Sequence, residues 1–462
     1  MTPTATPTPI EHARRDRDAA LARLQDFVRI PSVSTDPAHA ADVARAAEWL
    51  ADRLRAAGAQ AVRVDPTARH PIVYGEWLGA PGAPTVLVYG HYDVQPPDPV
   101  ELWATPPFEP TLKDGALYAR GASDDKGQAL THVEALAAYT AADRTPPVNL
   151  KYVFEGEEEI GSPNLEAWVR AHAADLAADV AVISDTAMVA PGQPSIVYAL
   201  RGLSYLEVEV TGPPRDLHSG QFGGAVRNPI NALCAMIAQL HDADGRVTIP
   251  GFYDPVRPLD DAERASLAAA PFDAGAFRRA AGAAGSWGEA GYSAVERMGA
   301  RPTLDANGIW GGFTGPGAKT VLPSKAFAKL SMRLVPDQDS DTVAAQCAAH
   351  LRSLAPEGIQ VEVRNLHGGQ PAMIDRAHPA LRAAARAYEA AFGRAPVFTR
   401  EGGSIPVVAL LGEALGLSSV MLGFGLPDDN LHAPNEKFEV EHFHKGIETV
   451  IAFLDALPEA LA

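Results

Sequence analysis

The sequence predicts an α/β protein with a mostly parallel sheet, helices on both faces of that sheet, and an inserted smaller α+β domain. Three observations support this prediction. Apolar runs of strand length alternate with amphipathic helical patterns up to about residue 190. Between about 200 and 366 the strand patterns alternate apolar with polar residues instead, and from 377 the first pattern returns. A strand buried on both faces is apolar throughout, whereas a strand with one exposed face alternates.

The elements before residue 190 follow one another in an order typical of such a sheet. Helices are expected over 17–30, over a stretch that begins with Asp36 and Pro37 and ends at Gly58, and over 126–140. Continuous apolar strands are expected at 84–90, 150–154 and 180–183. Because helices separate these strands, the strands can run parallel in one sheet.

The elements after residue 200 define the inserted domain and the return to the first one. The expected elements are alternating strands at 204–211, 325–335 and 358–366, helices at 227–242 and 339–354, helices with loops over 251–300, a strand at 418–423 and a closing helix at 440–457. The predicted organisation is a disordered tail at 1–10, a discontinuous catalytic domain at 11–199 and 367–462, and the inserted domain at 200–366.

Composition narrows the classes of function. The chain has 462 residues and a formal net charge of −18, which argues against nucleic acid or an anionic membrane as a partner. No run approaches the roughly 18 apolar residues of a membrane span, and the start MTPTATPTPI lacks the basic and apolar parts of a secretory signal. Cys234 and Cys347 lie in apolar helical patterns and are expected to be buried free thiols. The cytoplasm is therefore the expected compartment.

Side chains that can bind metals follow the predicted strands. In an open α/β sheet, ligands bind outside the carboxyl ends of the strands. Two divalent ions need about six protein donors between them, and one carboxylate can serve both. Two histidines and three carboxylates at these strand ends and in nearby loops meet that requirement: His91, Asp124, Glu159, Asp185 and His432.

Each of these residues also has an ordinary structural explanation. A lone His at a strand end is usually hydrogen-bonded within the protein, Asp124 could cap the helix that follows it, and Asp185 could be a turn residue. An acidic run is usually exposed, but the run Glu155–Glu159 continues a buried strand, where charge repulsion would be costly without a cation. The coincidence of metal-binding residue types at four places favours a metal centre.

Long motifs, each different from the others, are spread along most of the chain, between about residues 85 and 440. They are Gly90-His-Tyr-Asp-Val-Gln-Pro96, Gly121-Ala-Ser-Asp-Asp-Lys-Gly127, Glu155-Gly-Glu-Glu-Glu-Ile-Gly-Ser162, Ile183-Ser-Asp185, Arg215-Asp-Leu-His-Ser-Gly220, Gly317-Ala-Lys-Thr-Val-Leu-Pro323, Met332-Arg-Leu-Val-Pro336, Arg400-Glu-Gly-Gly-Ser404 and His432-Ala-Pro-Asn-Glu-Lys437. In this order they resemble the co-catalytic zinc aminoacylase/carboxypeptidase/dipeptidase family, and within it the branch of cytosolic non-specific dipeptidases and carnosinases.

The resemblance implies a role for each metal-site residue. Asp124 would bridge two metal ions, His91 and Asp185 would complete one site, and Glu159 and His432 would complete the other. The ions would be zinc in the first place, with manganese or cobalt also suited to nitrogen and oxygen ligands.

The resemblance also assigns the residues around the ligands. Glu158 would be the general base, and Asp93 would accept the second ring N–H of His91. Glu157 leaves the acidic run ambiguous by one position, and the Ile-Gly-Ser that follows the run fixes the assignment. Adjacent residues on extended chain point to opposite sides, which would separate the tasks of Glu158 and Glu159.

The inserted domain is expected, by the same resemblance, to act as a lid and a dimerisation domain. His218 would stabilise the tetrahedral oxyanion in the active site of the partner subunit of a homodimer. Arg333 would bind a substrate carboxylate through both arms of its guanidinium. The further substrate contacts would be Thr320, Gly403, Ser404 and His367.

The expected function is the hydrolysis of the peptide bond of dipeptides or other short peptides by a hydroxide that bridges the two metals. One alternative is a hydrolase of N-acyl or N-carbamoyl amino acids that uses the same metal site. A second alternative is a binding module on a peptidase-like scaffold, but such a module would be expected to lack several ligands. All five ligands and the base are present in this sequence.

Overall fold

A computed structural model describes residues 7–462, which divide into two compact units. Unit 1 comprises Met1–Tyr198, Ile374–Phe398 and Leu410–Ala462, and unit 2 comprises Ala199–Met373 and Thr399–Ala409. The sequence places the two borders at 199/200 and 366/367. The short return of 399–409 to unit 2 was not expected from the sequence.

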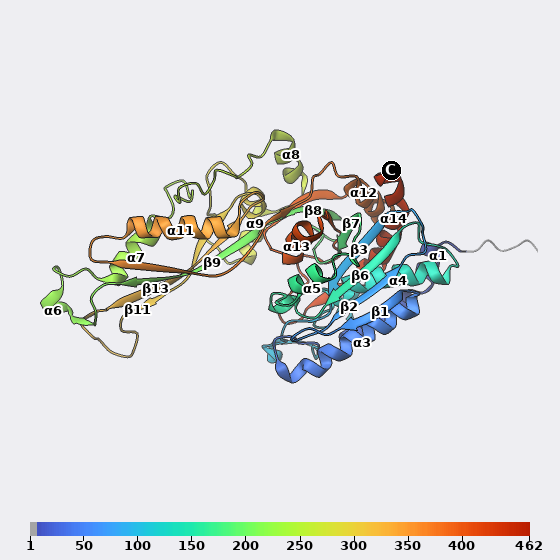
Figure 1. The fold of residues 1–462 in the computed structure, drawn as a ribbon, viewed down its shortest axis with the longest axis horizontal. Coiled ribbons are helices and arrows are strands. Elements are labelled where there is room, and N and C mark those ends of the chain that lie inside the picture. Colours follow the sequence, from blue (N-terminus) through green and yellow to red (C-terminus); the bar gives the residue numbers. More distant parts are fainter. Residues whose placement is uncertain (1–6) are drawn as a thin grey trace, which may run out of the picture. The chain divides into compact units, whose positions relative to one another are not determined.

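The central sheet, or unit 1 sheet, has nine strands over the described residues. Seven of them follow the order β1-β2-β6-β3-β7-β17-β8, and β15 (Ala372–Met373) and β16 (Val397–Glu401) pair with β8 (Figure 1). The seven strands are β1 (Gln60–Asp65), β2 (Ile72–Trp77), β3 (Thr85–His91), β6 (Asn149–Glu155), β7 (Val180–Ile183), β17 (Ser419–Met421) and β8 (Ser195–Leu200). The pairs β3–β6, β3–β7 and β7–β17 are parallel, while β1–β2, β2–β6 and β8–β17 are antiparallel. The centre of the sheet is parallel, which confirms the predicted fold class.

The helices of unit 1 pack against this sheet and against one another. They are α1 (Pro9–Arg15), α2 (Arg17–Val28), α3 (Ala40–Ala57), α4 (Lys126–Ala141), α5 (Leu165–Ala171), α12 (Pro379–Phe392) and α14 (Val440–Leu461). The chain runs from β3 through α4 to β6 and then, in the opposite direction across the sheet, through α5 to β7. Because such crossovers are right-handed, α4 and α5 cover opposite faces of the sheet.

The helix predicted after Asp36 begins and ends as expected. The Asp36 side chain accepts the backbone N–H of Ala38 at 2.9 Å and starts a short 3₁₀ turn, which leads into α3. Gly58 ends α3 with a φ of +101°, a conformation that favours glycine. The remaining elements of unit 1 are 3₁₀ turns and a small sheet of β4 (Thr111–Lys113), β5 (Ala116–Tyr118) and β18 (Lys437–Glu439).

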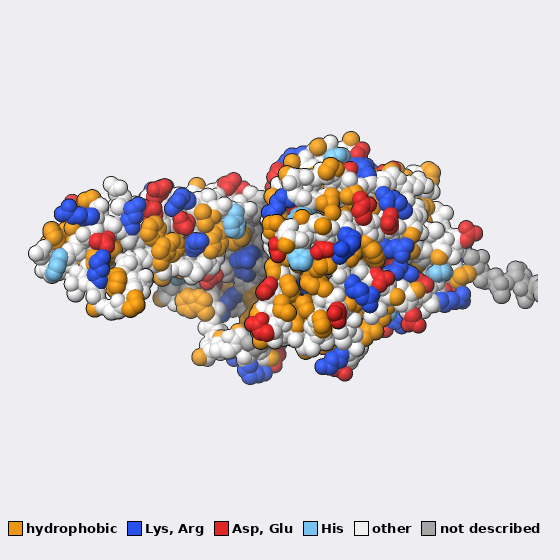
Figure 2. Space-filling view, turned by 90° about the horizontal axis from the view of Figure 1, so that it is seen from below, with side chains coloured by type: hydrophobic (Ala, Val, Ile, Leu, Met, Phe, Trp, Pro, Cys, Tyr) orange, Lys and Arg blue, Asp and Glu red, His pale blue; other side chains and the backbone are white. Residues whose placement is uncertain are grey.

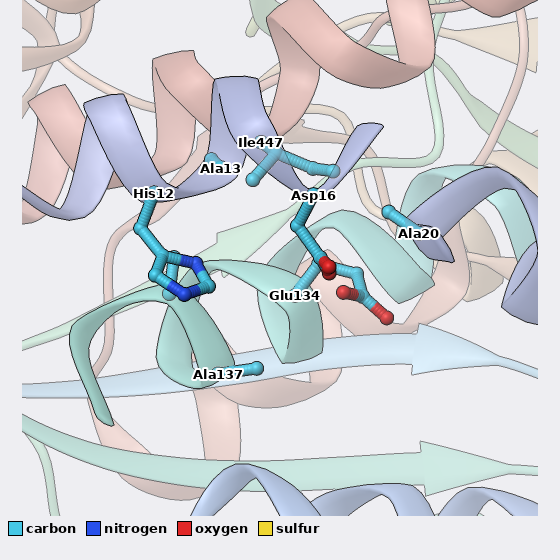
Figure 3. Close-up of a pocket in the computed structure, with 8 residues that line it drawn as sticks. His12, Ala13, Asp16, Ala20, Glu134, Ala137 and Ile447 are labelled. Carbon is cyan, nitrogen blue, oxygen red and sulfur yellow. The ribbon is translucent and has the colours of Figure 1, made fainter. Parts of the chain in front are cut away.

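The N-terminal region corrects part of the predicted disordered tail. Residues 1–6 lie outside the described residues, but Pro9 and Ile10 already belong to α1, which Thr8 caps. α1 packs against α4 and α14, and residues of α1, α2, α4 and α14 line a pocket of about 30 Å³, enough for about one water molecule (Figure 3). The carboxylates of Asp16 and Glu134 lie beside it, and both pair with Arg23. A capping box and apolar packing order these residues despite their Thr/Pro-rich flank.

Unit 2 is a four-stranded antiparallel sheet with helices on one face (Figure 1). Its strands, in spatial order, are β11 (Thr303–Gly311), β13 (Lys325–Leu334), β9 (Gly202–Thr211) and β14 (Gln360–Gly369). Alternate residues of β9 and β13 are buried under α7 (Pro229–Ala238) and α11 (Ser340–Leu354), and together they form the hydrophobic core of this unit. β11 was not predicted, because its Asp-Ala-Asn-Gly segment reads as a turn.

The other elements of unit 2 and of the borders are short. They are β10 (Leu217–His218), α6 (Ser219–Phe222), α8 (Asp261–Ala269), α9 (Ala274–Ala280), α10 (Ala294–Gly299), β12 (Val321–Leu322), β15 (Ala372–Met373), β16 (Val397–Glu401) and α13 (Pro406–Leu415). The helices and loops expected over 251–300 are confirmed by α8, α9 and α10.

The two cysteines differ in burial, which corrects one expectation. Cys347 is buried in the core of unit 2, but Cys234 is exposed. The buried face of α7 is formed by Pro229, Ala232, Leu233 and Met236, a spacing of three and four residues, and Cys234 falls outside it. Because α7 is apolar in composition, its sequence did not show which of its faces is buried.

Acidic and basic side chains are mixed over the surface, as the face in Figure 2 shows. Within residues 7–462, no helix combines the length and the apolar character that a membrane crossing requires.

Candidate metal centre

The five side chains expected to bind metals converge at one edge of the unit 1 sheet. β3 ends at His91, Asp185 follows the end of β7, and Asp124 lies in the loop before α4. Glu159 lies in a short 3₁₀ helix after β6, and His432 lies in the loop that follows β17. Because the central strands run parallel, their carboxyl ends meet at the same edge, and residues far apart in sequence come together there.

Two groups of potential ligands share one residue. The first group is His91, Asp124 and Asp185, and the second is Asp124, Glu159 and His432; within each group the ligating atoms lie within 4.8 Å of one another. Asp124 belongs to both groups, as a bridging carboxylate would.

The two oxygens of Asp124 divide between the groups. Oδ1 lies 3.1 Å from Nε2 of His91, and Oδ2 lies 3.0 Å from Nε2 of His432. In the first group Nε2 of His91 lies 3.9 Å from Oδ2 of Asp185, and in the second Nε2 of His432 lies 3.3 Å from Oε2 of Glu159. Each group therefore offers one imidazole and two carboxylates, a donor set that suits zinc and other divalent ions.

Positive charge at this edge would stabilise the ionised form of its carboxyl groups. Burial raises the pKa of Asp185 to about 7, and the charges of Asp124 and Glu159 act in the same direction. Burial also raises the pKa of Glu158 to about 9, with Asp185, Glu159 and Asp124 adding to the effect. Since nearby positive charge favours the ionised form of a carboxyl group, divalent cations would reverse these shifts. The residues present fit a pair of such cations.

Asp93 holds the surrounding backbone in place. Its two carboxylate oxygens accept the backbone N–H groups of Glu158 at 3.2 Å and Glu159 at 3.1 Å. Nδ1 of His91 lies 3.1 Å from the carbonyl oxygen of Asp93 and 3.5 Å from its carboxylate. The sequence predicted the carboxylate as the acceptor for this ring nitrogen, but the carbonyl oxygen is the nearer one. Asp93 thus positions a ligand from each group.

The acidic run Glu155–Glu159 leads into a turn, and its side chains have different surroundings. Residues Glu158–Ile160 form a 3₁₀ helix, so the extended chain expected at Glu158 and Glu159 is wrong. Glu157 points away from the metal groups: its buried carboxylate accepts hydrogen bonds from Thr67, from the His70 backbone and from Asn164. The sequence left open by one position which residues of the acidic run are the base and the ligand. The hydrogen bonds of Glu157 give it a structural role instead.

Glu436 was quoted within a motif but was given no role from the sequence. One of its oxygens accepts the backbone N–H groups of Ser123 at 2.9 Å and Asp124 at 3.1 Å. The other accepts the N–H of Gly121 at 2.9 Å and a hydrogen bond from the buried Arg120 at 2.7 Å. This buried carboxylate fixes the loop that presents Asp124. A hydrogen-bonding partner 312 residues away leaves no local signal in the sequence.

A second residue that the sequence left without a role is Gln95. Its side-chain amide donates to Oε2 of Glu159 at 2.7 Å, the oxygen that also lies next to His432. Gln95 therefore orients a ligand of the second group.

Three of the substrate residues expected from the sequence lie together in unit 2. Nη1 of Arg333 donates to Oγ of Ser404 at 3.2 Å, and the carbonyl of Gly403 accepts the backbone N–H of Arg201 at 3.2 Å. Nε of Arg201 donates to the carbonyl of Gly402 at 3.1 Å. Arg201 was missed because a lone Arg between two strands usually lies at the surface.

The other substrate residues lie elsewhere in unit 2. His218 is exposed; it pairs with Val321 across β10 and β12, and its Nδ1 accepts the backbone N–H of Gly220 at 3.0 Å. The carbonyl of Thr320 accepts the N–H of Ser219 at 3.0 Å, so Thr320 and His218 are neighbours. His367 lies on β14 and stacks on Tyr205, with ring centroids 5.1 Å apart.

Comparisons with known proteins find similar sequences and structures along nearly the whole chain. The sequence pattern of the peptidase family M20/M25/M40 matches residues 87–456. The Cys-Gly metallodipeptidase dug1 of Schizosaccharomyces pombe is 34% identical over 459 residues, covering 96% of each chain. The human Beta-Ala-His dipeptidase is 32% identical, covering 95% of this chain and 90% of the relative. A solved structure of the di-peptidase Dug1p from Saccharomyces cerevisiae has a TM-score of 0.80 at 31% identity and covers 98% of this chain and 99% of that chain.

Proposed function

Because the chain belongs to the peptidase family M20/M25/M40, we propose that it is a metal-dependent dipeptidase that hydrolyses the peptide bond of dipeptides or other short peptides. The observation that carries the proposal is the position of Asp124, whose two oxygens face two separate groups of metal-binding side chains. The names of the relatives, a Cys-Gly metallodipeptidase and a Beta-Ala-His dipeptidase, support the choice of substrate class.

We assign two divalent cations to the two groups. His91, Asp124 and Asp185 would hold one, and Asp124, Glu159 and His432 would hold the other. Zinc is the first choice for this mixture of nitrogen and oxygen donors, and manganese or cobalt would also fit. When bound, the ions would supply Lewis acidity to the scissile carbonyl and lower the pKa of a water molecule.

Glu158 is proposed to move the proton. Its side chain is half-buried next to Glu159, and the Asp93 carboxylate fixes its backbone N–H. In this place it would take a proton from the attacking water and give it to the nitrogen of the leaving amine. Asp93 acts indirectly, by positioning Glu158, Glu159 and His91.

Arg333 is proposed to bind the carboxylate of the substrate. A guanidinium group binds a carboxylate through two parallel hydrogen bonds, and Ser404 already orients one arm of Arg333. A clamp on the terminal carboxylate would restrict the substrates to short chains after the scissile bond. Gly403, Thr320 and His367 are proposed as further substrate contacts, on the basis of their motifs.

A substrate panel tests the proposed function. After chelation the protein should hydrolyse neither dipeptides nor N-acetylated amino acids, and added Zn²⁺ or Mn²⁺ should restore turnover of dipeptides such as Cys-Gly or β-Ala-His. Release of the free amino acids, measured by chromatography, is the readout. If only N-acetyl or N-carbamoyl amino acids are hydrolysed, the chain is an acyl-amino-acid hydrolase. If metals bind but nothing is hydrolysed, the enzymatic proposal is wrong.

His218 is proposed to stabilise the oxyanion in the active site of the partner in a homodimer. The side chain is exposed on the β10–α6 turn, and its Nδ1 accepts the backbone N–H of Gly220 at the start of α6. Donation of a hydrogen bond to a developing oxyanion accounts for a substantial part of catalysis in many hydrolases.

Mixing two inactive variants tests this arrangement. His218→Ala and Glu158→Gln should each be nearly inactive alone. If His218 acts in the other subunit, a mixed dimer has one intact site. About half of the dimers in an equal, freely exchanging mixture are mixed, so about a quarter of wild-type activity should return. Activity that stays at the level of the separate variants, although mass spectrometry shows mixed dimers, would contradict a role in the partner's site.

The cytoplasm is the proposed compartment. Cys234 and Cys347 are both free, and free thiols suit a reducing environment. A short peptide is the proposed binding partner besides the second subunit.

A further inference from the structure

A cavity of about 480 Å³ lies in unit 2, next to the residues of the proposed carboxylate clamp. It is lined by one side of β11 and β13 and by the segment around α10. Arg333 and Arg201 form part of its wall, so a ligand held by Arg333 would lie beside this space. The volume is in the range of small-molecule binding sites.

Four arginines line the cavity, and among the described residues three of them form no ion pair with a carboxylate. Arg301 forms two hydrogen bonds, of 2.7 and 2.8 Å, with the carboxylate of Glu289, so its charge is balanced. Within residues 7–462, no carboxylate lies within ion-pair distance of Arg201, Arg297 or Arg333.

The three unbalanced arginines are held in place by neutral acceptors. Arg201 donates to the Gly402 carbonyl, as described above, and Arg297 donates to the carbonyls of Glu289 at 2.8 Å and Trp287 at 3.1 Å. Burial and, to a smaller extent, the charge of Arg333 lower the pKa of Arg201 to about 10, while the charge of Asp305 acts in the opposite direction. Asp305 is the remaining acidic residue of the wall. The cavity thus has a surplus of positive charge that fixed backbone contacts maintain.

We propose that this cavity is a subsite for a second negative charge of the substrate, so that the enzyme prefers dipeptides whose C-terminal residue is Glu or Asp. The proposal rests on the proposed function. Arg333 binds the main-chain carboxylate of that residue, and Arg201 and Arg297 attract the side-chain carboxylate. Trp287 and Met298 supply apolar surface for the methylene groups between the two carboxylates. A neutral side chain of the same shape leaves the guanidinium groups without a counter-charge.

Pairs of isosteric dipeptides test the subsite in the metal-loaded full chain. The kcat/KM for Ala-Glu should exceed that for Ala-Gln on the order of tenfold, which is the effect expected from one hydrogen-bonded charge pair. Arg201→Gln and Arg297→Gln should each bring this ratio close to one. Arg364→Gln is the matched control, because Arg364 is an exposed arginine of unit 2 that pairs with Glu207 outside the cavity; it should keep the wild-type ratio.

A binding measurement separates this inference from the proposed function. Calorimetric titration of the metal-loaded protein with glutamate and with glutamine requires no turnover, and glutamate should bind on the order of tenfold more tightly. Equal kcat/KM for Ala-Glu and Ala-Gln, or equal affinity for the two amino acids, would overturn the subsite while leaving the dipeptidase proposal intact. Tighter binding of glutamate that Arg201→Gln removes, in a protein that hydrolyses no dipeptide, would support the subsite and count against the proposed function alone.

Discussion

Glu158→Gln should lower kcat about 10²–10⁴-fold while both metal ions stay bound, because a positioned proton carrier contributes about this factor to catalysis. The amide has nearly the shape of the carboxyl group, but it cannot take a proton from water. The backbone N–H of Glu158 still donates to Asp93, so the position of the residue should not change. Steady-state kinetics with a good dipeptide substrate, together with metal analysis of the same sample, measures both parts of the prediction.

The control for this substitution is Glu166→Gln. Glu166 lies on α5, is exposed and pairs with Arg170 on the same helix, so its loss should alter kcat little. Retention of more than about a tenth of wild-type kcat by Glu158→Gln would show that another group carries the proton. A loss of metal along with activity would instead mean that Glu158 is a ligand.

Asp124→Asn should weaken binding at both metal sites. The side-chain amide of Asn has a single oxygen, so it can bind the metal ion of one group only and presents its NH₂ to the other. Asp124 presents an oxygen to each group. The loss of affinity should exceed the roughly 10–100-fold effect of losing an outer-shell partner. Competition with a fluorescent chelator measures the affinities, and inductively coupled plasma mass spectrometry measures the ions retained.

Single-site substitutions and a neighbouring control complete this test. Asp185→Asn and His432→Gln each alter one group, so each should lose one ion and keep the other. Asp125→Asn is the matched control: Asp125 lies outside both groups, and its oxygen accepts the His91 backbone N–H at 3.2 Å, which an amide oxygen can also do. If Asp124→Asn keeps one ion at wild-type affinity, Asp124 does not bridge.

The clustering of the five candidate ligands could be predicted because parallel strands impose a simple geometry. His91 and Asp185 follow directly after buried apolar runs, and the carboxyl ends of such strands share one edge of a sheet. The second signal was the position of the acidic run that contains Glu159. This run continues a strand that has to lie in the interior, where carboxylates are unusual. Asp124 and His432, which sit in loops, could be placed at this edge only through the motifs around them.

The supporting residues could not be predicted, because their partners are distant in sequence. Glu436 fixes the loop of Asp124 through backbone N–H groups, and Arg201 holds the turn at Gly402. A backbone acceptor or donor is present at every residue, so composition and periodicity carry no information about such pairs. The turn at Glu158 and the exposed position of Cys234 were missed for a related reason: the direction of a side chain depends on local backbone geometry that the residue type does not determine.

Asp124 is proposed to join two metal sites at the carboxyl edge of the unit 1 sheet. Anomalous diffraction from crystals of the zinc-loaded protein, recorded on both sides of the zinc absorption edge, tests it directly. We expect two zinc peaks, one among His91, Asp124 and Asp185 and the other among Asp124, Glu159 and His432, with an oxygen of Asp124 bound to each. Zinc located away from these side chains, or a single peak without Asp124 as a ligand, would contradict it.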